Sequence, residues 1–349
     1  MNSLEGNNMI KVGISGYGTI GQRLADGVAR QGDMELVGVA DFAPTLSIRA
    51  LKEKGMPYDL YLVDGADKSK FDELDIPVAG NFDELCQKVD IMLDSSPAGI
   101  GMKNKEIYKK YGIKAVFQGG ESNDVADVFF HGPANYEKGI NQDYLKLTSC
   151  NTTGLIRAVS ALDQAYGVER VAVTIVRRVA DPGDYHRGLT NALQVEQAPT
   201  HQAVDLMTVL PHIEATGILV HTPVTHGHFI SVTVHGKDKI TKEQVLEAFK
   251  KNDRIRIVRL EDGFLGNASL FKYARDLGHT RGDLYEIAVW ENTVVEFGDE
   301  VMFGIHIPQE SVTIPETMDA VRAACGMQDN KAEALAKTNE YLGLGSWKK

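Results

Sequence analysis

The sequence predicts an α/β protein in two parts: a doubly wound parallel sheet, then an α+β domain built on a mainly antiparallel sheet. Three observations lead to this fold class. Short apolar runs alternate with amphipathic stretches up to residue 150, and a glycine-rich turn joins the first apolar run to the first amphipathic stretch. After residue 151, long alternating runs follow one another with few helices between them. Strand–helix alternation favours a parallel sheet, whereas successive alternating strands favour an antiparallel one.

In the first part, apolar runs bounded by charge or glycine predict the strands, at 10–15, 35–40, 90–96, 114–120 and 145–149. Helical spacing of apolar residues predicts the helices between them, at 20–31, 81–89 and 103–112. Because each strand is followed by a stretch long enough for a crossover, we expect the strands to run parallel.

In the second part, a helix over about 153–165 is expected first. Val171, Val173 and Ile175 then alternate with the other face of a strand. Further strands are predicted, so that the set is 170–180, 217–224, 228–236, 285–297 and 300–307. Two helices are expected at the end of the chain, the first opened by Pro315, a residue favoured in a first helical turn.

The composition excludes several classes of protein. A chain of 349 residues is long enough for two domains. A formal charge of −11 argues against a nucleic-acid partner, because phosphate backbones require a basic surface. No apolar run is long enough to span a membrane, and no secretory signal is visible at the start. Three cysteines do not suggest a disulfide framework, so we expect a cytoplasmic protein.

The glycine-rich turn predicts a dinucleotide site of the Rossmann type. Gly16, Gly18 and Gly21 have the G-x-G-x-x-G spacing between a predicted strand and a helix, and Asp41 ends the second strand. Such glycines let the backbone approach a pyrophosphate, and the acid binds ribose hydroxyls and repels a 2′-phosphate. With no basic residue between Asp41 and Arg49, NAD is favoured, with NADP possible. The alternative is a glycine turn without a ligand.

The segment "LTSCNTTGL" predicts a nucleophile at Cys150. This cysteine falls where a strand meets a helix, and a helix N-terminus favours the thiolate. Asn151 and the following backbone amides can donate hydrogen bonds to a developing oxyanion. Cysteines are usually buried apolar residues, and we interpret Cys86 and Cys325, which lie on apolar stripes, in that way.

A thiolate also needs a partner, and "THGHFISV" offers His226 and His228 two residues apart. On a strand both would face one side, with His226 at its entrance, so we predict that His226 is the catalytic base for Cys150. A metal pair of the H-x-H type and a purely structural role are the alternatives. No cysteine or acid lies close in sequence, and we predict no metal.

Together these residues resemble a known family, the archaeal-type (class II) glyceraldehyde-3-phosphate dehydrogenases. The resemblance extends from about residue 9 to about 345, and its motifs appear in order: "GYGTIG", "QGGE", "SCNTTGL", "VRRVADP", "HGHF" and "PQESVTIPE". It implies an enzyme that oxidises glyceraldehyde 3-phosphate to 1,3-bisphosphoglycerate, and the reverse, with a nicotinamide dinucleotide and inorganic phosphate. Cys150 would form a thiohemiacetal and then a thioester, which phosphate attacks.

The resemblance also implies residue roles. For the dinucleotide it implies Thr19, Ile20, Gly120, Arg178 and Gln309, beside the three glycines and Asp41. For the substrate the residues are Ser149, Asn151, Thr152, Arg177, His201 and Gln202, with Arg177 or Arg178 bonding to phosphate groups. The last helices of the family return to the first domain, so the dinucleotide-binding domain is expected at 1–150 and about 310–349, with a catalytic domain at 151–309. A homotetramer is expected.

The sequence departs from the family at three places. His201 is followed by Gln202 where the family has a second histidine, Pro308 stands in place of another, and Gly188–Asn191 reads Gly-Leu-Thr-Asn. Residues at these positions would contact the phosphate or hydroxyl groups of the substrate, so two alternatives for the activity stay open. One is a dehydrogenase of another phospho-aldehyde or a semialdehyde on the same scaffold, and the other is a dinucleotide-binding protein without catalysis.

Overall fold

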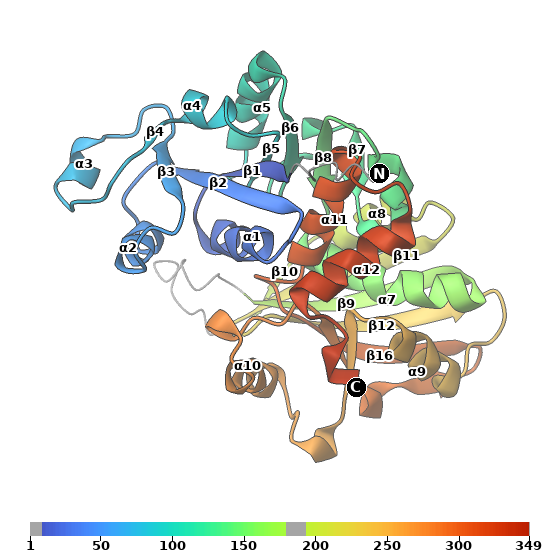
Figure 1. The fold of residues 1–349 in the computed structure, drawn as a ribbon. Helices are drawn as coiled ribbons and strands as arrows, with labels where there is room; N and C mark the ends of the chain where they lie inside the picture. The colour runs from blue at the N-terminus through green and yellow to red at the C-terminus, as the bar shows by residue number, and fades with distance from the viewer. Residues whose placement is uncertain (1–8, 179–192, 349) are drawn as a thin grey trace, which may run out of the picture. The chain divides into compact units, whose positions relative to one another are not determined.

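The computed structural model describes residues 9–178 and 193–348, and the chain divides into two compact units, which are described separately. Unit 1 comprises Met1–Leu147 and Ile314–Leu342, and unit 2 comprises Thr148–Thr313 and Gly343–Lys349 (Figure 1). The end of the chain, 343–349, therefore groups with unit 2, although the sequence analysis assigned all of 310–349 to the dinucleotide-binding part. Within unit 2 the Arg256 guanidinium stacks over the Trp347 ring at 4.7 Å.

Unit 1 is an eight-stranded sheet with strand order β4-β3-β2-β1-β5-β6-β8-β7, in which every paired strand is parallel to its neighbour. The strands are β1 Ile10–Ser15, β2 Met34–Asp41, β3 Asp59–Leu62, β4 Gly80–Asn81, β5 Ile91–Asp94, β6 Lys114–Phe117, β7 Val128–Phe130 and β8 Tyr144–Leu147. The helices are α1 Thr19–Ala29, α2 Leu46–Glu53, α3 Ser69–Asp72, α4 Phe82–Cys86, α5 Ile100–Tyr111, α6 Gly132–Asn135, α11 Ile314–Ala324 and α12 Lys331–Leu342. The predicted doubly wound parallel sheet is confirmed. Its strand order reverses between β1 and β5, where such sheets bind ligands.

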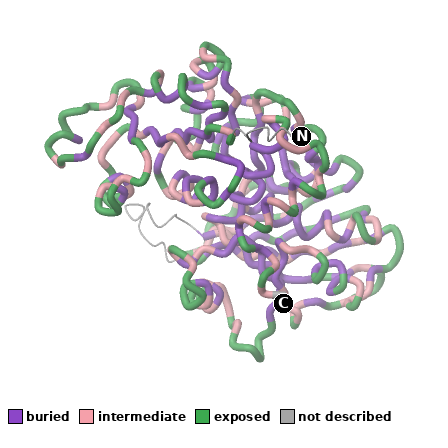
Figure 2. Tube along the Cα trace, in the orientation of Figure 1, coloured by how far each residue is buried: buried purple, intermediate pink, exposed green. Residues whose placement is uncertain are grey.

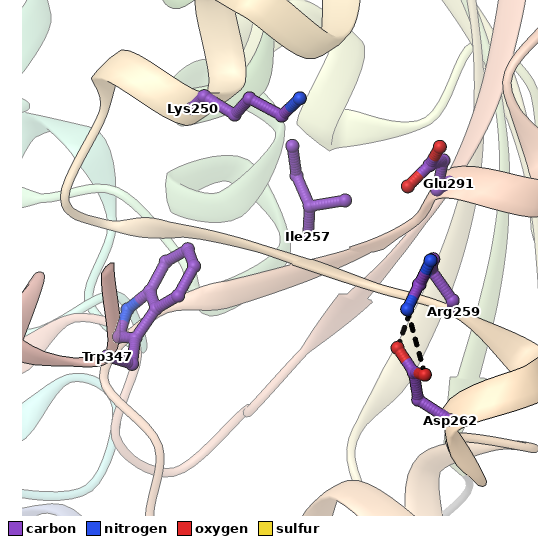
Figure 3. A pocket seen from close by; sticks show the side chains of 6 residues that line it. All are labelled: Lys250, Ile257, Arg259, Asp262, Glu291 and Trp347. Carbon is purple, nitrogen blue, oxygen red and sulfur yellow. Dashed lines mark hydrogen bonds and ion pairs between the residues drawn. The ribbon is translucent and has the colours of Figure 1, made fainter. Parts of the chain in front are cut away.

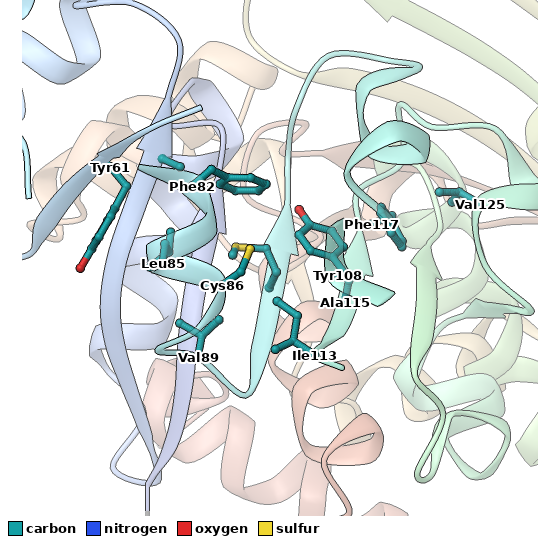
Figure 4. Packing of buried hydrophobic residues seen from close by; sticks show 12 residues of the cluster. Tyr61, Phe82, Leu85, Cys86, Val89, Tyr108, Ile113, Ala115, Phe117 and Val125 are labelled. Atoms are coloured by element: carbon teal, nitrogen blue, oxygen red, sulfur yellow. The ribbon is translucent and has the colours of Figure 1, made fainter. Parts of the chain in front are cut away.

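Apolar side chains of α4 and α5 build one half of the core of unit 1. Phe82, Leu85 and Cys86 from α4 pack with Tyr108 from α5 over Phe117 and its neighbours in the sheet (Figure 4). The thiol of Cys86 is therefore part of this apolar cluster, as the sequence indicates, and burial raises its pKa to about 12.

The C-terminal helix α11 belongs to the core of unit 1 and contacts α1, β6 and β8. All of its residues are buried (Figure 2). A side chain at Gly27 of α1 would come within 2.7 Å of Ile314, so a glycine is needed where the two helices meet. The buried Arg322 donates hydrogen bonds to Asp33 and Gln31, each at 2.8 Å. These contacts explain why helices distant in sequence join the first sheet.

Unit 2 is a mixed sheet with strand order β10-β11-β9-β12-β16-β14-β13, and β15 pairs with β16. Of the seven strand pairs among the described residues of unit 2, five are antiparallel, which confirms the predicted mainly antiparallel sheet. The strands are β9 Val168–Arg178, β10 Gln194–Val195, β11 Glu214–Thr222, β12 His228–Gly236, β13 Ile255–Val258, β14 Ile287–Trp290, β15 Val295–Phe297 and β16 Glu300–Ile307. The helices are α7 Cys150–Tyr166, α8 His201–Val209, α9 Lys242–Lys251 and α10 Asn267–Asp276.

Helix α7 packs closely against this sheet. A side chain at Gly154 would lie 2.2 Å from Ile307 of β16, so the glycine permits the close approach. The single strand expected at 285–297 is wrong: a turn at Glu291–Thr293 divides it into β14 and β15, which pair with different parts of β16. Within residues 9–178 and 193–348, none of the helices combines the length and the apolar character needed to cross a membrane.

Candidate active site

The three glycines of the G-x-G-x-x-G motif form a turn before α1, and no side chain caps the start of this helix. Gly16 has a φ of +85°, in the left-handed region that favours glycine. A side chain at Gly21 would lie 1.9 Å from the Gly16 carbonyl oxygen, whereas one at Gly18 would meet nothing within 4 Å. Gly18 is the N-cap and offers no side chain to the first-turn amides of Thr19 and Ile20. Those amides can therefore bind an anion, and the turn fits a dinucleotide pyrophosphate.

Asp41 stands at the end of β2 with its carboxylate held by the backbone. One oxygen accepts a hydrogen bond from the Tyr17 amide at 2.9 Å, and the other accepts from the Phe42 amide at 2.6 Å. The oxygen bound to Phe42 also accepts from the Ala43 amide at 3.4 Å. The carboxylate is thus fixed beside the glycine turn, and the oxygen that accepts from Tyr17 keeps a lone pair for a ribose hydroxyl. Gly120 follows β6, with no atom within 4 Å of the place of a side chain.

A buried polar network supports the glycine turn, and the sequence analysis did not find it. Asp94, at the end of β5, accepts hydrogen bonds from Tyr108 at 2.6 Å and from Asn104 at 2.9 Å. Next to it, Ser95 donates to the Gly16 carbonyl at 2.8 Å. An acid and two serines directly after an apolar strand are the signal that points to this network. It fixes the loop on which the Gly16 turn rests.

In unit 2, α7 begins at Cys150, in agreement with the predicted strand-to-helix junction. Ser149 is the N-cap, and its hydroxyl oxygen accepts a hydrogen bond from the Thr152 amide at 3.4 Å. Cys150 is half-buried, in contrast to the fully buried Cys86. Its sulfur therefore lies in the first turn of a 17-residue helix, where the helix dipole favours a thiolate.

The histidine that contacts the thiol is His228, and not His226 as predicted. The Cys150 sulfur lies 3.6 Å from Nε2 of His228. His226 is exposed and bonds to Thr225, and its ring packs at a steep angle to the Phe271 ring, with 5.0 Å between the ring centroids. The reason lies in the backbone: Gly227 has a φ of +73°, so β12 starts only at His228 and the strand alternation does not reach back to His226.

His228 is almost fully buried, and its second ring nitrogen is engaged. Nδ1 accepts a hydrogen bond from the Arg178 backbone amide at 3.1 Å. Burial and the nearby guanidinium groups of Arg178 and Arg177 hold the pKa of His228 well below its ordinary value. The two ring nitrogens of His228 therefore face the Cys150 sulfur and the Arg178 amide.

The side chains of Arg177 and Arg178 bind to different groups. The buried Arg178 guanidinium donates to the Thr225 carbonyl and to the Glu310 carboxylate, each at 3.0 Å. The half-exposed Arg177 lies 3.9 Å from Glu196, which also contacts His221 at 2.7 Å. Arg178 is thus held inside unit 2, whereas Arg177 keeps part of its surface open to a bound anion.

Helix α8 reaches the first turn of α7. Its residue Asp205, which the sequence analysis did not single out, accepts a hydrogen bond from Thr152 at 3.3 Å. His201 begins α8, and its ring contacts the side-chain amide of Gln202 at 2.8 Å. The side-chain oxygens of Gln202 and Asn151 are buried with no hydrogen-bond partner among the described residues. Such atoms usually mark the place of a ligand or water.

Two further predicted features are Gln309 and the departure at Gly188–Asn191. Gln309 follows β16 in unit 2, on the segment that carries Glu310. The Gly188–Asn191 departure lies outside the described residues. A cavity of about 240 Å³ is lined by Lys250, Ile257, Arg259, Asp262, Glu291 and Trp347, none of them a predicted site residue (Figure 3). Its Arg259 is already paired with Asp262, at 2.8 Å.

Comparison with known proteins gives concordant results. Residues 149–292 match the protein family "Glyceraldehyde 3-phosphate dehydrogenase, C-terminal domain". The chain is 42% identical over 337 residues to glyceraldehyde-3-phosphate dehydrogenase of Thermococcus kodakarensis, covering 96% of this chain and 99% of that protein. The enzyme of the same name from Methanothermobacter thermautotrophicus is 38% identical over 340 residues, covering 96% and 100%.

Among solved structures, the chain is similar to aspartate semialdehyde dehydrogenase II from Vibrio cholerae. The TM-score is 0.60, with 16% identity, and the similarity covers 94% of this chain and 99% of the other. At this identity the likeness concerns the fold alone.

Proposed function

The chain belongs to the glyceraldehyde-3-phosphate dehydrogenase family, and from this premise we propose that it oxidises glyceraldehyde 3-phosphate to 1,3-bisphosphoglycerate, and catalyses the reverse, with a nicotinamide dinucleotide. The observation that carries the proposal is a cysteine in the first turn of a long helix with an imidazole nitrogen 3.6 Å from its sulfur. Such a pair is the arrangement of a nucleophilic thiolate.

In the proposed reaction the Cys150 thiolate attacks the aldehyde carbon and forms a thiohemiacetal. A bound dinucleotide supplies an acceptor for the hydride, which leaves a thioester on Cys150. Inorganic phosphate then attacks the thioester carbon, and the acyl phosphate departs as the thiolate is restored. His228 faces the sulfur throughout. Asn151 and the first-turn amides of α7 are proposed to donate hydrogen bonds to the substrate oxygen.

We propose that the dinucleotide binds to unit 1 through the glycine turn, the first residues of α1 and the carboxylate of Asp41. The proposed contacts in unit 1 are Gly16, Gly18, Thr19, Ile20, Gly21, Asp41 and Gly120, and the family resemblance also implies Arg178 and Gln309. The Arg178 guanidinium already binds Glu310 and the Thr225 carbonyl. NAD is proposed over NADP, since a fixed carboxylate at Asp41 repels a 2′-phosphate.

We propose that unit 2 binds the substrate, with its phosphate groups beside Arg177. The proposed substrate contacts are Ser149, Asn151, Thr152, Arg177, His201 and Gln202. The partnerless buried oxygens of Asn151 and Gln202 support this set. Gln202 stands where the family has a histidine, and its amide can both donate and accept a hydrogen bond.

The homotetramer is also a proposal, and it is supported by one face of the unit 2 sheet. The strand register aligns Met302 of β16 with Thr233 of β12 and continues through β9 to β11. Ile218 of β11 lies two residues beyond the aligned position, so it faces the same side of the sheet as Met302. Met302 is 37% exposed and Ile218 is 48% exposed. Other apolar residues of the sheet, such as Phe297, are exposed as well. Exposed apolar side chains on an open sheet face favour contact with another subunit. We also propose a cytoplasmic location, because the three cysteines form no disulfide.

A steady-state assay tests the proposed function. NADH formation from glyceraldehyde 3-phosphate should depend on added phosphate and exceed the rate with aspartate semialdehyde. The Cys150→Ala variant should form no NADH while binding the dinucleotide as the unmodified protein does. Phosphate-independent turnover, or a faster rate with the semialdehyde, would favour a different aldehyde dehydrogenase. A protein that binds the dinucleotide without any turnover would be the non-catalytic alternative.

A further inference from the structure

The Glu196 carboxylate, which follows β10 in unit 2, lies between an arginine and a histidine. Its oxygen Oε1 is 2.7 Å from Nε2 of His221 and 3.9 Å from Nη1 of Arg177. We propose that Arg177 and His221 form one anion site for a phosphate group, and that Glu196 occupies this site until the phosphate displaces its carboxylate. The inference rests on the proposed function and adds His221 and Glu196 to the site at Arg177.

Arg177 and His221 are neighbours across two parallel strands. The register of β9 and β11 pairs Arg177 with His221, so both side chains point to the same face of the sheet. The antiparallel register of β9 and β12 pairs Val176 with Phe229. One residue further along, it sets His228 opposite Arg177. The side chains of His221, Arg177 and His228 therefore form one row across the sheet, with Arg177 in the middle.

The row lies on the face of the sheet where the thiol lies. The ring of His228 is 3.6 Å from the sulfur of Cys150, the first residue of α7. Neighbouring strands are about 4.8 Å apart, so the backbones of His221 and His228 are about 10 Å apart. A phosphate group between Arg177 and His221 can therefore belong to a short molecule whose aldehyde carbon meets the sulfur, or to a phosphate ion that attacks the thioester.

The site is open to solvent, and only one side chain has to move to clear it. The side chains of Arg177, Glu196 and His221 are 37%, 36% and 17% exposed. At 3.9 Å the Arg177 nitrogen is beyond hydrogen-bond distance of the carboxylate, so Glu196 does not use up the guanidinium donors. The Glu196 amide donates to the Leu219 carbonyl at 3.2 Å, which fixes the main chain. A rotation of the Glu196 side chain is then sufficient.

A phosphate group fits this pair of side chains better than the carboxylate does. It carries a charge of about −1.5 to −2 and three acceptor oxygens, whereas a carboxylate has one charge and two oxygens. A guanidinium can bind phosphate through two parallel hydrogen bonds. Because a carboxylate only accepts, Nε2 of His221 carries a proton and can donate to the phosphate in its place. While Glu196 occupies the site, the apparent phosphate affinity is reduced by the fraction of molecules in which the site is open.

Calorimetric titration with inorganic phosphate, at low ionic strength and without dinucleotide, tests the anion site. Glu196→Gln keeps the size of the side chain and removes its charge, so the Kd for phosphate should fall about threefold to tenfold. Glu214→Gln is the matched control, because it removes the same charge at the opposite, exposed end of β11. Its Kd should change by less than about twofold. An unchanged or higher Kd in Glu196→Gln, or an equal fall in the control, overturns the inference.

The part of His221 is tested in the Glu196→Gln background, where the histidine no longer holds a carboxylate. Adding His221→Ala to this variant should raise the Kd for phosphate again by about threefold to tenfold. A cooperative urea transition shows that both variants are folded. If the Kd of the folded double variant equals that of Glu196→Gln, His221 does not bind the anion and the inference is overturned.

Steady-state KM values identify the source of the phosphate group. In Glu196→Gln, a lower KM for glyceraldehyde 3-phosphate assigns the site to the phosphate of the aldehyde. A lower KM for inorganic phosphate assigns it to the attacking phosphate. Turnover in which neither KM falls overturns the inference. If the unmodified protein forms no NADH, the proposed function fails, and the calorimetric Kd values alone decide whether Arg177 and His221 form an anion site.

Discussion

The alanine variant of Gly18 tests where the dinucleotide binds. Gly18 has a φ of −81°, which any residue adopts, and a side chain there would meet no atom within 4 Å. Replacing a glycine N-cap by alanine should therefore change the free energy of unfolding by less than about 1 kcal/mol. If the pyrophosphate lies against the amides of Thr19 and Ile20, the new methyl group occupies its place. Dinucleotide affinity should then fall about 100-fold, which corresponds to about 2.7 kcal/mol.

Gly21→Ala is the matched comparison, because its side chain would collide with the turn itself. The Gly16 carbonyl oxygen, 1.9 Å from the new carbon, would have to move by about 1.5 Å to reach ordinary contact. We expect this variant to lose both affinity and about 1–3 kcal/mol of stability. Fluorescence titration with NADH measures affinity, and urea unfolding measures stability. Unchanged NADH affinity in Gly18→Ala, with normal folding, would refute the predicted place of the pyrophosphate.

Three further predictions follow from individual residues. Iodoacetamide at neutral pH should modify Cys150 before Cys86 and Cys325, because burial raises the pKa of both other thiols to about 12, so they stay protonated; peptide mass mapping checks the order. Asp41→Asn should raise the ratio of NADP to NAD in kcat/KM by about tenfold or more, since it removes the charge that repels a 2′-phosphate; an unchanged ratio would show that Asp41 does not face the ribose. Arg322→Met should lower the free energy of unfolding by about 1–3 kcal/mol in urea melts, because the buried Gln31 and Thr338 lose their donor while the Asp33 carboxylate keeps Lys337 at 2.9 Å; an unchanged stability would contradict this.

The sequence predicted those features that depend on local pattern. The parallel sheet follows from strand–helix alternation, and the glycine turn follows from a spacing in which Gly16 and Gly21 each have a separate steric reason. The position of Cys150 at the start of α7 follows from the polar residues around it. In each case the residues that form the sequence pattern are the same residues that form the structural element.

Other features depend on contacts between distant segments, and the sequence did not reveal them. The choice between His226 and His228 depends on the backbone of Gly227, because a positive φ ends the alternation on which the prediction relied. The engagement of Arg178 depends on Glu310, which is 132 residues away. Asp205 meets the first turn of α7 only because α8 packs against that helix.

The identity of the residue that carries the acyl group tests the account most directly. The protein would be mixed with glyceraldehyde 3-phosphate and NAD without phosphate, quenched in acid, digested and analysed by mass spectrometry. We predict one 3-phosphoglyceroyl group on the peptide that contains Cys150, lost when phosphate is added before the quench. An adduct on another residue, or NADH formation with no adduct on Cys150, would contradict the account.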